Sequence, residues 1–330
     1  MSDSGRRQPL PSPNHPADQA TSFLSGGGEM GARMRAMDWA KTPLGPPASW
    51  PQSLRTSVST CLNSRFPILI WWGPELVMLY NDAYRPILGT TKHPQALGAP
   101  GRMVWPEIWD IIGPMLEGVI SRSGATWSED QMLPLDRKGF VEECYFTFSY
   151  SPIRNETGDV GGIFTAVTET TGRVLGERRM RVLRELAARV VEARQPEEAC
   201  RIATETLAKH TSDVPFALLY LLTPDGDEAR LCGTVGLAPD TPASPAHVSL
   251  SADDAGNAAA GWPLAQTARE GRVETVSDLK ARFGLLPGGP WEESPHTALV
   301  LPIIRPGQTG PYGLMVVGIS PRLELDEVRV

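Results

Sequence analysis

The sequence predicts an α+β protein with two tandem domains, each a central antiparallel sheet flanked by helices, joined by a connecting helix. Its apolar runs, such as Phe66–Trp72 and Phe216–Leu222, are far shorter than the roughly 18 residues of a membrane span and favour strands. These runs are separated by residues that favour turns, namely Gly, Pro, Asn and Asp. A charged amphipathic segment over 173–193 separates two such sets of strands, which indicates two sheets.

The amino-acid composition and net charge exclude several classes of function. The 330 residues are 41% hydrophobic and 21% charged, and the net charge of −7 argues against nucleic acid as a partner. No segment resembles a signal peptide or a membrane helix, so we expect a cytoplasmic protein. The four cysteines occur singly, which argues against disulfides and a zinc site.

The N-terminal region divides at about residue 28. Residues 1–28 are rich in Ser, Pro, Gly and Gln, and we expect a disordered tail. Gly26–Gly31 matches G-x-G-x-x-G, but no strand precedes it, so a flexible linker is the better interpretation. Residues 29–63 predict a helical cap, in which Met30, Met34 and Met37 share one helix face before Gln52–Asn63 resumes as helix.

The first sheet begins with a tight hairpin. Phe66–Trp72 and Leu76–Tyr80 are strands separated by Gly73-Pro74, and Asn81-Asp82 offers an N-cap for a helix over Ala83–Leu88. A longer helix is predicted over Ile111–Ser121.

Three further strands follow: Thr126–Pro134, Val141–Ile153 and Gly161–Thr168. Their turns are 137–139 and 155–159. The middle strand alternates, with Tyr145, Thr147 and Ser149 on one side and Phe146, Phe148 and Tyr150 on the other. Asp130, Glu142 and Glu143 are expected to be solvated strand-edge residues.

The segment "WGPELVMLYNDAYRPILG" resembles the opening of PAS domains in bacterial sensor histidine kinases, and "DWAKTPLGPPASWPQSLRT" resembles the cap that precedes them. Five strands, with helices between the second and third, is the PAS order. The resemblance implies that residues 64–171 form a domain that recognises a signal and catalyses nothing. It also implies that Glu169 and Thr171 couple the last strand to the outgoing helix, in the place of an Asp-x-Thr motif.

Aromatic residues gather in this region, where they either fill the core or line a pocket. The candidates for the lining of a pocket are Trp72, Tyr80, Trp105, Trp109, Tyr145 and Phe148. Among the histidines, only His93 is worth testing as a ligand, although Pro94 argues against a helical placement.

The connecting helix over 172–195 carries an apolar seam of Met180, Leu183, Ala187 and Val190, spaced as in a heptad. This spacing predicts either a signalling helix that pairs with a second copy of the chain or a helix packed on its own domain. The first alternative implies a homodimer.

Residues 196–330 predict a helix over Glu197–Thr211 followed by five strands: Phe216–Leu222, Ala229–Val235, Glu274–Val276, Ala298–Ile304 and Gly313–Ile319. The phrases "PFALLYLL", "TALVLPI" and "GLMVVGIS" resemble a GAF domain. That resemblance implies a closing helix after the last strand, so we expect a fragment that stops before a kinase core. The candidates for the lining of a pocket here are Phe216, Tyr220, Cys232, Trp262, Val300 and Pro302.

Catalytic motifs are absent from the sequence. It contains no P-loop, HExxH or GxSxG motif, no phospho-acceptor histidine segment, and no haem, flavin or bilin motif, so we predict no catalytic or metal-binding residue and leave the cofactor unknown. The leading hypothesis is the sensory input region of a two-component sensor histidine kinase, whose partner is a small-molecule or protein signal and not a nucleic acid or a membrane. The alternatives are a thiol redox enzyme using Cys200 and Cys232, the input region of a serine phosphatase or cyclase regulator, and an interaction module without a ligand.

Overall fold

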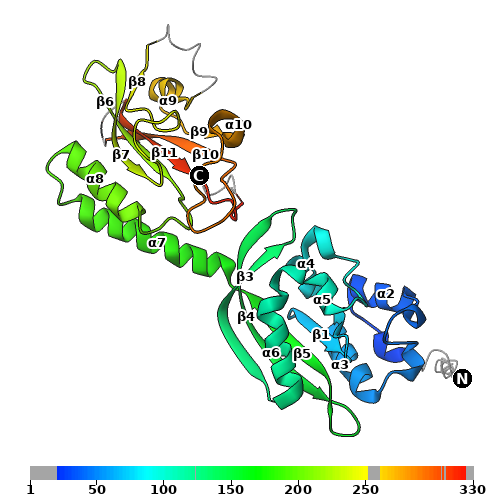
Figure 1. Cartoon of the computed structure of the whole chain (residues 1–330). Helices are drawn as coiled ribbons and strands as arrows, with labels where there is room; N and C mark the ends of the chain where they lie inside the picture. Colours follow the sequence, from blue (N-terminus) through cyan, green and yellow to red (C-terminus); the bar gives the residue numbers. More distant parts are fainter. Residues whose placement is uncertain (1–20, 123, 252–260, 306, 308–309, 325–330) are drawn as a thin grey trace, which may run out of the picture. The chain divides into compact units, whose positions relative to one another are not determined.

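The computed structural model describes residues 21–122, 124–251, 261–305, 307 and 310–324. The chain divides into two compact units, Met1–Gly172 and Arg173–Val330. Each unit contains one antiparallel sheet flanked by helices, which confirms the predicted fold class (Figure 1). No helix among the described residues has both the length and the apolar composition needed to cross a membrane.

The sheet of the first unit has five strands in the order β2-β1-β5-β4-β3. Neighbouring strands pair antiparallel throughout, and the hairpins turn where the sequence predicts them. The strands are β1 (Ile68–Trp72), β2 (Val77–Tyr80), β3 (Thr126–Asp136), β4 (Val141–Arg154) and β5 (Val160–Glu169). Phe146, Phe148 and Tyr150 of β4 are buried while Tyr145, Thr147 and Ser149 are half-buried, so the predicted alternation is confirmed.

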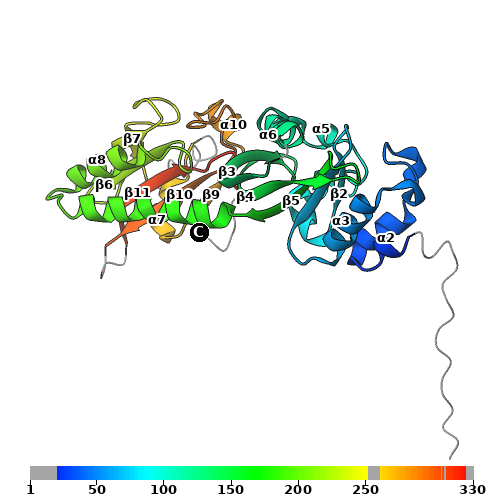
Figure 2. The ribbon, with the colours of Figure 1, turned by 90° about the horizontal axis from the view of Figure 1, so that it is seen from below.

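Helices cover both faces of this sheet near β1, which is why β1 is buried at every position. Figures 1 and 2 show α6 lying across one face. The helices between β2 and β3 are η4 (Asp82–Tyr84), α4 (Arg85–Lys92), α5 (Gly101–Val104), η5 (Pro106–Ile108) and α6 (Trp109–Arg122). The helices before β1 are η1 (Ser22–Leu24), α2 (Gly28–Ala36), η2 (Trp39–Lys41), η3 (Pro47–Ser49) and α3 (Gln52–Asn63), of which α3 contacts β1 and β2.

The glycines at 26–28 belong to a folded segment, so the predicted flexible linker is wrong. All three adopt left-handed backbone angles, and a Cβ on Gly27 would meet the side chain of Leu62 at 2.7 Å. The backbone N–H of Met30 donates to Asp82 at 3.0 Å, which anchors the start of α2. Residues 1–20 of the expected disordered tail lie outside the described residues, whereas Leu24 is 1% exposed, so the expected disorder of residues 21–28 is also corrected.

A buried asparagine connects the cap to the first hairpin. Asn81 is 1% exposed, and its Oδ1 accepts hydrogen bonds from the backbone N–H groups of Ile68 at 3.1 Å and Tyr84 at 3.2 Å. The Tyr84 bond is the N-cap that the sequence predicts. The Asn81 Nδ2 group donates to three carbonyl oxygens, those of Cys61, Ser64 and Phe66, at 2.7–3.1 Å. One side chain therefore satisfies backbone groups of α3, β1 and η4 that would otherwise be buried without partners.

The second unit has a six-stranded antiparallel sheet in the order β8-β7-β6-β11-β10-β9. Its strands are β6 (Ala217–Leu222), β7 (Glu228–Val235), β8 (His247–Ser249), β9 (Glu274–Val276), β10 (Ala298–Ile304) and β11 (Pro311–Gly318). Its helices are α7 (Thr171–Val190), which starts two residues inside the first unit, α8 (Pro196–Leu207), α9 (Leu264–Glu270) and α10 (Leu279–Phe283). The sequence prediction missed β8, α9 and α10, which are short and carry little periodicity.

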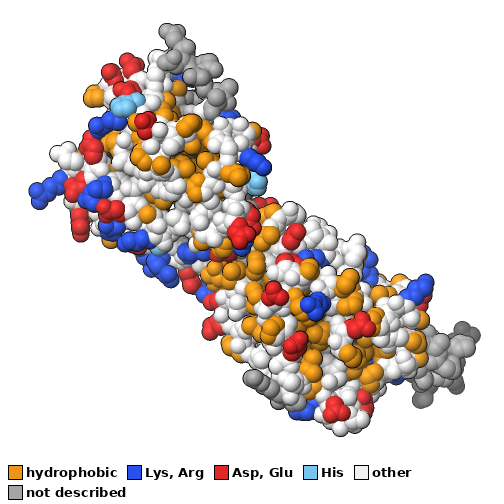
Figure 3. All heavy atoms as spheres, in the orientation of Figure 1, with side chains coloured by type: hydrophobic (Ala, Val, Ile, Leu, Met, Phe, Trp, Pro, Cys, Tyr) orange, Lys and Arg blue, Asp and Glu red, His pale blue; other side chains and the backbone are white. Residues whose placement is uncertain are grey.

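Helix α7 packs against its own unit with only one face. Val182 and Leu186 contact the cluster of Leu207, Ala217 and Val235. Ion pairs flank this contact, including the one between the Arg178 guanidinium and Asp213. The predicted apolar seam lies elsewhere on the helix: Met180 is 50% exposed, Leu183 is 58% exposed and Ala187 is also exposed, whereas Val190 is half-buried. Figure 3 shows basic side chains gathered along this helix.

The Asn81 network predicts a large loss of stability for one small substitution. Asn81→Asp replaces the donating amide by an acceptor that faces three carbonyl oxygens, so the free energy of unfolding of the first unit is expected to fall by about 3 kcal/mol or more. Urea titration followed by tryptophan fluorescence measures this, because seven of the nine tryptophans lie between Trp39 and Trp127. Asn63→Ala, which changes an exposed asparagine in α3, is the control and is expected to cost less than about 1 kcal/mol. Equal unfolding midpoints for the two variants would contradict the prediction.

Candidate functional site

A small cavity lies inside the first unit, between the sheet and the helices that follow β2. The cavity has a volume of about 40 Å³. Aromatic rings supply much of the wall: Trp71, Tyr84, Trp105, Phe146, Phe148 and Tyr150. Since no lining side chain carries a charge, the cavity is an apolar chamber with a few hydroxyl groups.

The hydroxyl groups of the cavity differ in their partners. The Thr165 hydroxyl accepts a hydrogen bond from the indole Nε1 of Trp71 at 2.8 Å. The phenol groups of Tyr84 and Tyr150 have no hydrogen-bond partner among the described residues, although these side chains are only 5% and 4% exposed. Burial raises the pKa of both phenols, and for Tyr84 the proximity of Tyr150 adds to the effect. Both remain neutral O–H groups at ordinary pH.

Only two of the six candidate pocket residues of this unit line the cavity. Trp105 and Phe148 line the cavity, whereas Trp72, Tyr80, Trp109 and Tyr145 do not. Successive side chains of a strand point to opposite faces, so Trp71 reaches the cavity and Trp72 lies on the other face of β1. The same parity places Tyr145 on the outer face of β4, where its hydroxyl donates to Glu143 at 2.7 Å.

His93 lies outside the cavity, in a chain of polar contacts with Tyr80. It is the C-cap residue of α4, and its Nδ1 is 3.0 Å from the Tyr80 hydroxyl. Its Nε2 is 3.3 Å from a carboxylate oxygen of Glu29, and Glu29 also pairs with Arg33 and Arg85. These contacts connect α2 of the cap to β2, so His93 has a structural role here.

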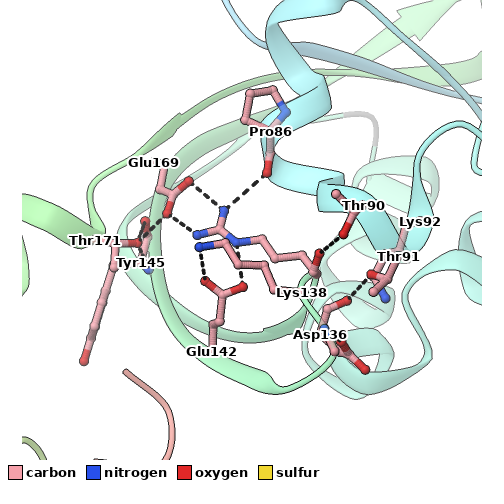
Figure 4. A network of polar contacts seen from close by, with 12 residues as sticks. Pro86, Thr90, Thr91, Lys92, Asp136, Lys138, Glu142, Tyr145, Glu169 and Thr171 are labelled. Atoms are coloured by element: carbon pink, nitrogen blue, oxygen red, sulfur yellow. Dashed lines mark hydrogen bonds and ion pairs between the residues drawn. The ribbon is translucent and has the colours of Figure 1, made fainter. Parts of the chain in front are cut away.

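A partly buried ion-pair network lies where β5 ends and α7 begins (Figure 4). The Arg137 guanidinium donates two hydrogen bonds to Glu169, both at 2.8 Å, and one to Glu142 at 3.2 Å. The Thr171 hydroxyl donates to Glu169 at 2.9 Å, and it accepts from the backbone N–H of Tyr145 at 2.9 Å. Glu169 and Thr171, the residues expected to couple sheet to helix, are thus joined through Arg137 to the turn between β3 and β4.

Arg137 also contacts the helix that forms part of the cavity wall. Its carbonyl oxygen accepts a hydrogen bond from the backbone N–H of Thr90 at 3.0 Å. The helix α4 breaks at Gly89 (φ 62°), where a Cβ would come within 2.2 Å of that same oxygen. Because Ile87, two residues earlier, lines the cavity, a continuous path of contacts runs from the cavity through α4 and Arg137 to Glu169 and the start of α7.

The predictions for the acidic residues near this turn need correction. Glu142 and Glu143 are 7% and 2% exposed, so they are not solvated strand-edge residues. The Arg137 guanidinium and the Tyr145 hydroxyl supply the partners that make this burial possible. Arg137 itself was predicted only as a turn residue. The only nearby residue that could have indicated its ion pairing was Glu142, since its main partner Glu169 lies 32 positions away in the sequence.

In the second unit, four of the six candidate residues meet in one packed cluster. Phe216, Tyr220, Trp262 and Val300 share this core. Pro302 is half-buried further along β10. Cys232 lies in a different cluster with Cys200, Leu219 and Leu221, because it projects from the opposite face of the sheet. Core packing accounts for the four residues of the shared cluster. Trp262 also lines a hollow with Pro242 and His247.

The two cysteines of this unit come together but lack the features of reactive thiols. Burial raises the pKa of the Cys200 thiol to about 11 and also raises that of Cys232. A thiolate is the nucleophilic form of cysteine, so both groups are poor nucleophiles at neutral pH. This arrangement gives the thiol-enzyme alternative no support.

Comparison with known proteins concerns mainly the second unit. Residues 193–330 match the family model of the GAF domain. No curated protein matches the chain.

Solved structures resemble parts of the chain at low sequence identity. The GAF domain of an Acinetobacter phosphoenolpyruvate-protein phosphotransferase is 18% identical and covers 46% of this chain and 82% of its own, with a TM-score of 0.32. A putative GAF sensor protein from Burkholderia vietnamiensis is 14% identical, with 45% and 83% coverage and a TM-score of 0.32. A sensory box sensor histidine kinase from Vibrio cholerae is 17% identical, with 32% and 77% coverage and a TM-score of 0.25.

The ion pair of Glu169 predicts a specific dependence on pH. Burial alone would raise the pKa of this carboxyl group, but the hydrogen bonds from Arg137 and Thr171 outweigh burial and hold the pKa below its ordinary value of 4.5. A carboxyl group with a lowered pKa in the folded state contributes stability that is fully present above its ordinary pKa. That stability is lost as the pH falls through the folded-state value.

We therefore expect the free energy of unfolding of the wild type to exceed that of Glu169→Gln at about pH 7, by about 2 kcal/mol. The difference should shrink as the pH falls below about 4.5, the ordinary pKa of the carboxyl group. Urea titrations across this range measure both quantities. Glu75→Gln, at an exposed glutamate, serves as the control with no comparable difference. A pH-independent gap between the wild type and Glu169→Gln would contradict the prediction.

Proposed function

We propose that the chain is the cytoplasmic sensory input region of a bacterial two-component sensor histidine kinase, with a PAS domain before its GAF domain. Five strands with helices between the second and third support the PAS assignment of the first unit. The GAF domain supports a sensory role more generally. The signal would be a small molecule or a protein that binds one conformation of the input region better than another.

The path of contacts between the cavity and α7 is the observation that carries this proposal. A ligand that displaces α4 changes the position of Thr90 against Arg137, and Arg137 is held by Glu169. Glu169 in turn accepts the hydrogen bond from Thr171, the first residue of α7. Binding energy in the cavity thus has a physical route to the start of the connecting helix.

We also propose that the apolar seam of α7 pairs with the same seam of a second copy. Its members follow heptad spacing, whereas Val182 and Leu186 of the other face are already occupied. Two exposed apolar residues, Met180 and Leu183, lie within one turn of each other among arginines, as at a helix pair with charged flanks.

The coupling proposal is tested by hydrogen exchange. Glu169→Ala leaves Arg137 without its main partner and Thr171 without its closer acceptor, so backbone amides in the first two turns of α7 are expected to exchange at least about tenfold faster, which corresponds to about 1.4 kcal/mol. The control is Glu177→Ala, which removes an exposed ion pair of the same helix. Unchanged exchange in the Glu169 variant would refute the coupling role. In a kinase that contains this region, the same variant is expected to abolish the response to signal while both domains stay folded.

The dimer proposal is tested by sedimentation equilibrium. The wild-type chain is expected to be a dimer, and Leu183→Glu is expected to weaken dimerisation by at least about tenfold, because it places charges at the centre of the seam. Arg181→Glu, on the same helix but outside the seam, is the control and should leave the dimer in place. A wild-type monomer at high micromolar concentration, or a dimer that tolerates Leu183→Glu, would refute the proposal.

A further inference from the structure

A surface hollow of about 510 Å³ lies at the end of the first sheet where three segments meet. These are the hairpin between β1 and β2, the last turn of α6 and the turn between β4 and β5. Apolar side chains supply much of the wall: Pro51, Trp72, Pro74, Leu76, Ile120 and Val160. The Trp72 ring rests on the backbone of Gly162, where a Cβ would come within 2.5 Å of the ring, so this part of the wall is fixed in place.

The polar groups of the hollow are already engaged. The Asn155 Oδ1 atom accepts a hydrogen bond from the backbone N–H of Thr157 at 3.0 Å. The Glu156 carboxylate accepts one from the backbone N–H of Ser53 at 2.8 Å. By contrast, Ile120 is 39% exposed, so an apolar side chain of the wall still faces water. An apolar group is therefore the occupant that gains most from this surface.

Negative charge surrounds the hollow. Four exposed carboxylates lie on its rim or close to its lining residues in the chain: Glu75, Glu117, Glu156 and Asp159. Of these, Glu117 shares a face of α6 with Ile120, three residues later. The basic residue of the adjacent turn, Arg154, donates to the carbonyl oxygen of Gly158 at 2.8 Å. An apolar segment with positive charge beside it is therefore the complementary occupant.

The described chain begins beside this hollow. The short helix η1 runs along α3 in the opposite direction: the Phe23 ring lies 5.6 Å from the Trp50 ring, whereas the Ser25 carbonyl oxygen accepts from Asn63 at the end of α3. Pro51, which follows Trp50, lines the hollow and directly precedes α3. The twenty residues before the described chain are therefore joined to the fold at the same end of α3 as the hollow.

The sequence of those twenty residues complements the hollow. Leu10 is their single large aliphatic side chain after Met1, and it lies in the proline-rich stretch Pro9–Pro13. Prolines favour the extended polyproline conformation, which lowers the entropy lost when such a segment docks against aromatic and apolar walls. Arg6 and Arg7 supply positive charge a few residues before Leu10.

The connecting length is sufficient for this contact. Position 10 lies eleven residues before the first described residue. A flexible segment of that length has a root-mean-square span of about 18 Å. A short tether of this kind also holds its two ends at an effective concentration in the millimolar range, so a contact too weak to form between separate molecules forms within one chain.

We infer that the hollow binds the chain's own N-terminal segment over residues 6–13, with Leu10 against Trp72 and Ile120 and with the two arginines against the acidic rim. The contact lies within the first unit and does not depend on the proposed function. The segment acts as a strap that covers an apolar surface and keeps other proteins from it.

Trypsin measures the contact in the full chain, because it cleaves after Arg6 and Arg7 when these residues are free of the fold. Leu10→Asp and Ile120→Asp are each expected to speed this cleavage at least about fivefold over the wild type, since a charge on either side excludes the leucine from the apolar wall. Mass spectrometry follows the released peptides. Leu10→Asp lies outside the described fold, so equal cleavage rates in this variant and the wild type would overturn the inference.

Matched variants control for the added charge. Asn14→Asp adds the same charge to the N-terminal segment outside Pro9–Pro13. Phe66→Asp adds it at a 50% exposed side chain before β1, whereas the hollow lies at the other end of that strand. Both controls should be cleaved at the wild-type rate. Acceleration in either control as large as in Leu10→Asp would show that charge alone is responsible, and the inference would fail.

Photo-cross-linking identifies the surface that the segment contacts. With p-benzoylphenylalanine in place of Leu10, irradiation is expected to join position 10 to lining residues of the hollow, such as Trp72 and Ile120. Mixing isotope-labelled with unlabelled chains separates products within one chain from products between chains, and we expect the former. Products that join two chains, products elsewhere on the fold, or no product at all would each refute the inference.

Discussion

The partly buried pairing of Arg137 with Glu169 is the interaction on which the junction of the first unit depends. A guanidinium that is only 11% exposed needs its charge balanced, and the bidentate geometry with Glu169 does this at two distances of 2.8 Å. Glu142 supplies a second carboxylate at 3.2 Å. Because these partners come from the β4 and β5 strands, the pair fixes the turn between β3 and β4 relative to the end of the sheet.

This pairing also connects the wall of the cavity to the start of α7. The cavity wall and the ion pair share α4, whose break at Gly89 lets the backbone approach Arg137 closely. A closely packed interior transmits a displacement instead of absorbing it. The hydroxyl of Thr171 accepts from the N–H of Tyr145 and donates to Glu169, so the first residue of α7 is bound to two strands at once.

The second unit distributes its polar and apolar contacts differently. One face of its sheet is covered by a packed core cluster. This cluster includes Phe216, Tyr220 and Val300, each of them fully buried. The helix α7 lies against the opposite face of this sheet through Val182 and Leu186, and it leaves the apolar seam exposed. The helix therefore has two apolar faces, of which one packs on its own unit.

The sequence by itself determined the fold class, every described strand except β8, the N-cap at Asn81 and the alternation of β4, because these follow from local periodicity and turn chemistry. The resemblance of its last strand to the Asp-x-Thr ending of PAS domains also singled out Glu169 and Thr171 as residues at the junction. Only the tertiary structure decided that Trp71 and not Trp72 faces the cavity, since β1 is apolar at every position and its pattern cannot distinguish the two faces. It alone revealed the role of Arg137, whose partner lies 32 residues away. An ion pair between residues far apart in the sequence forms only when the fold brings their strands together, so local sequence patterns do not predict it.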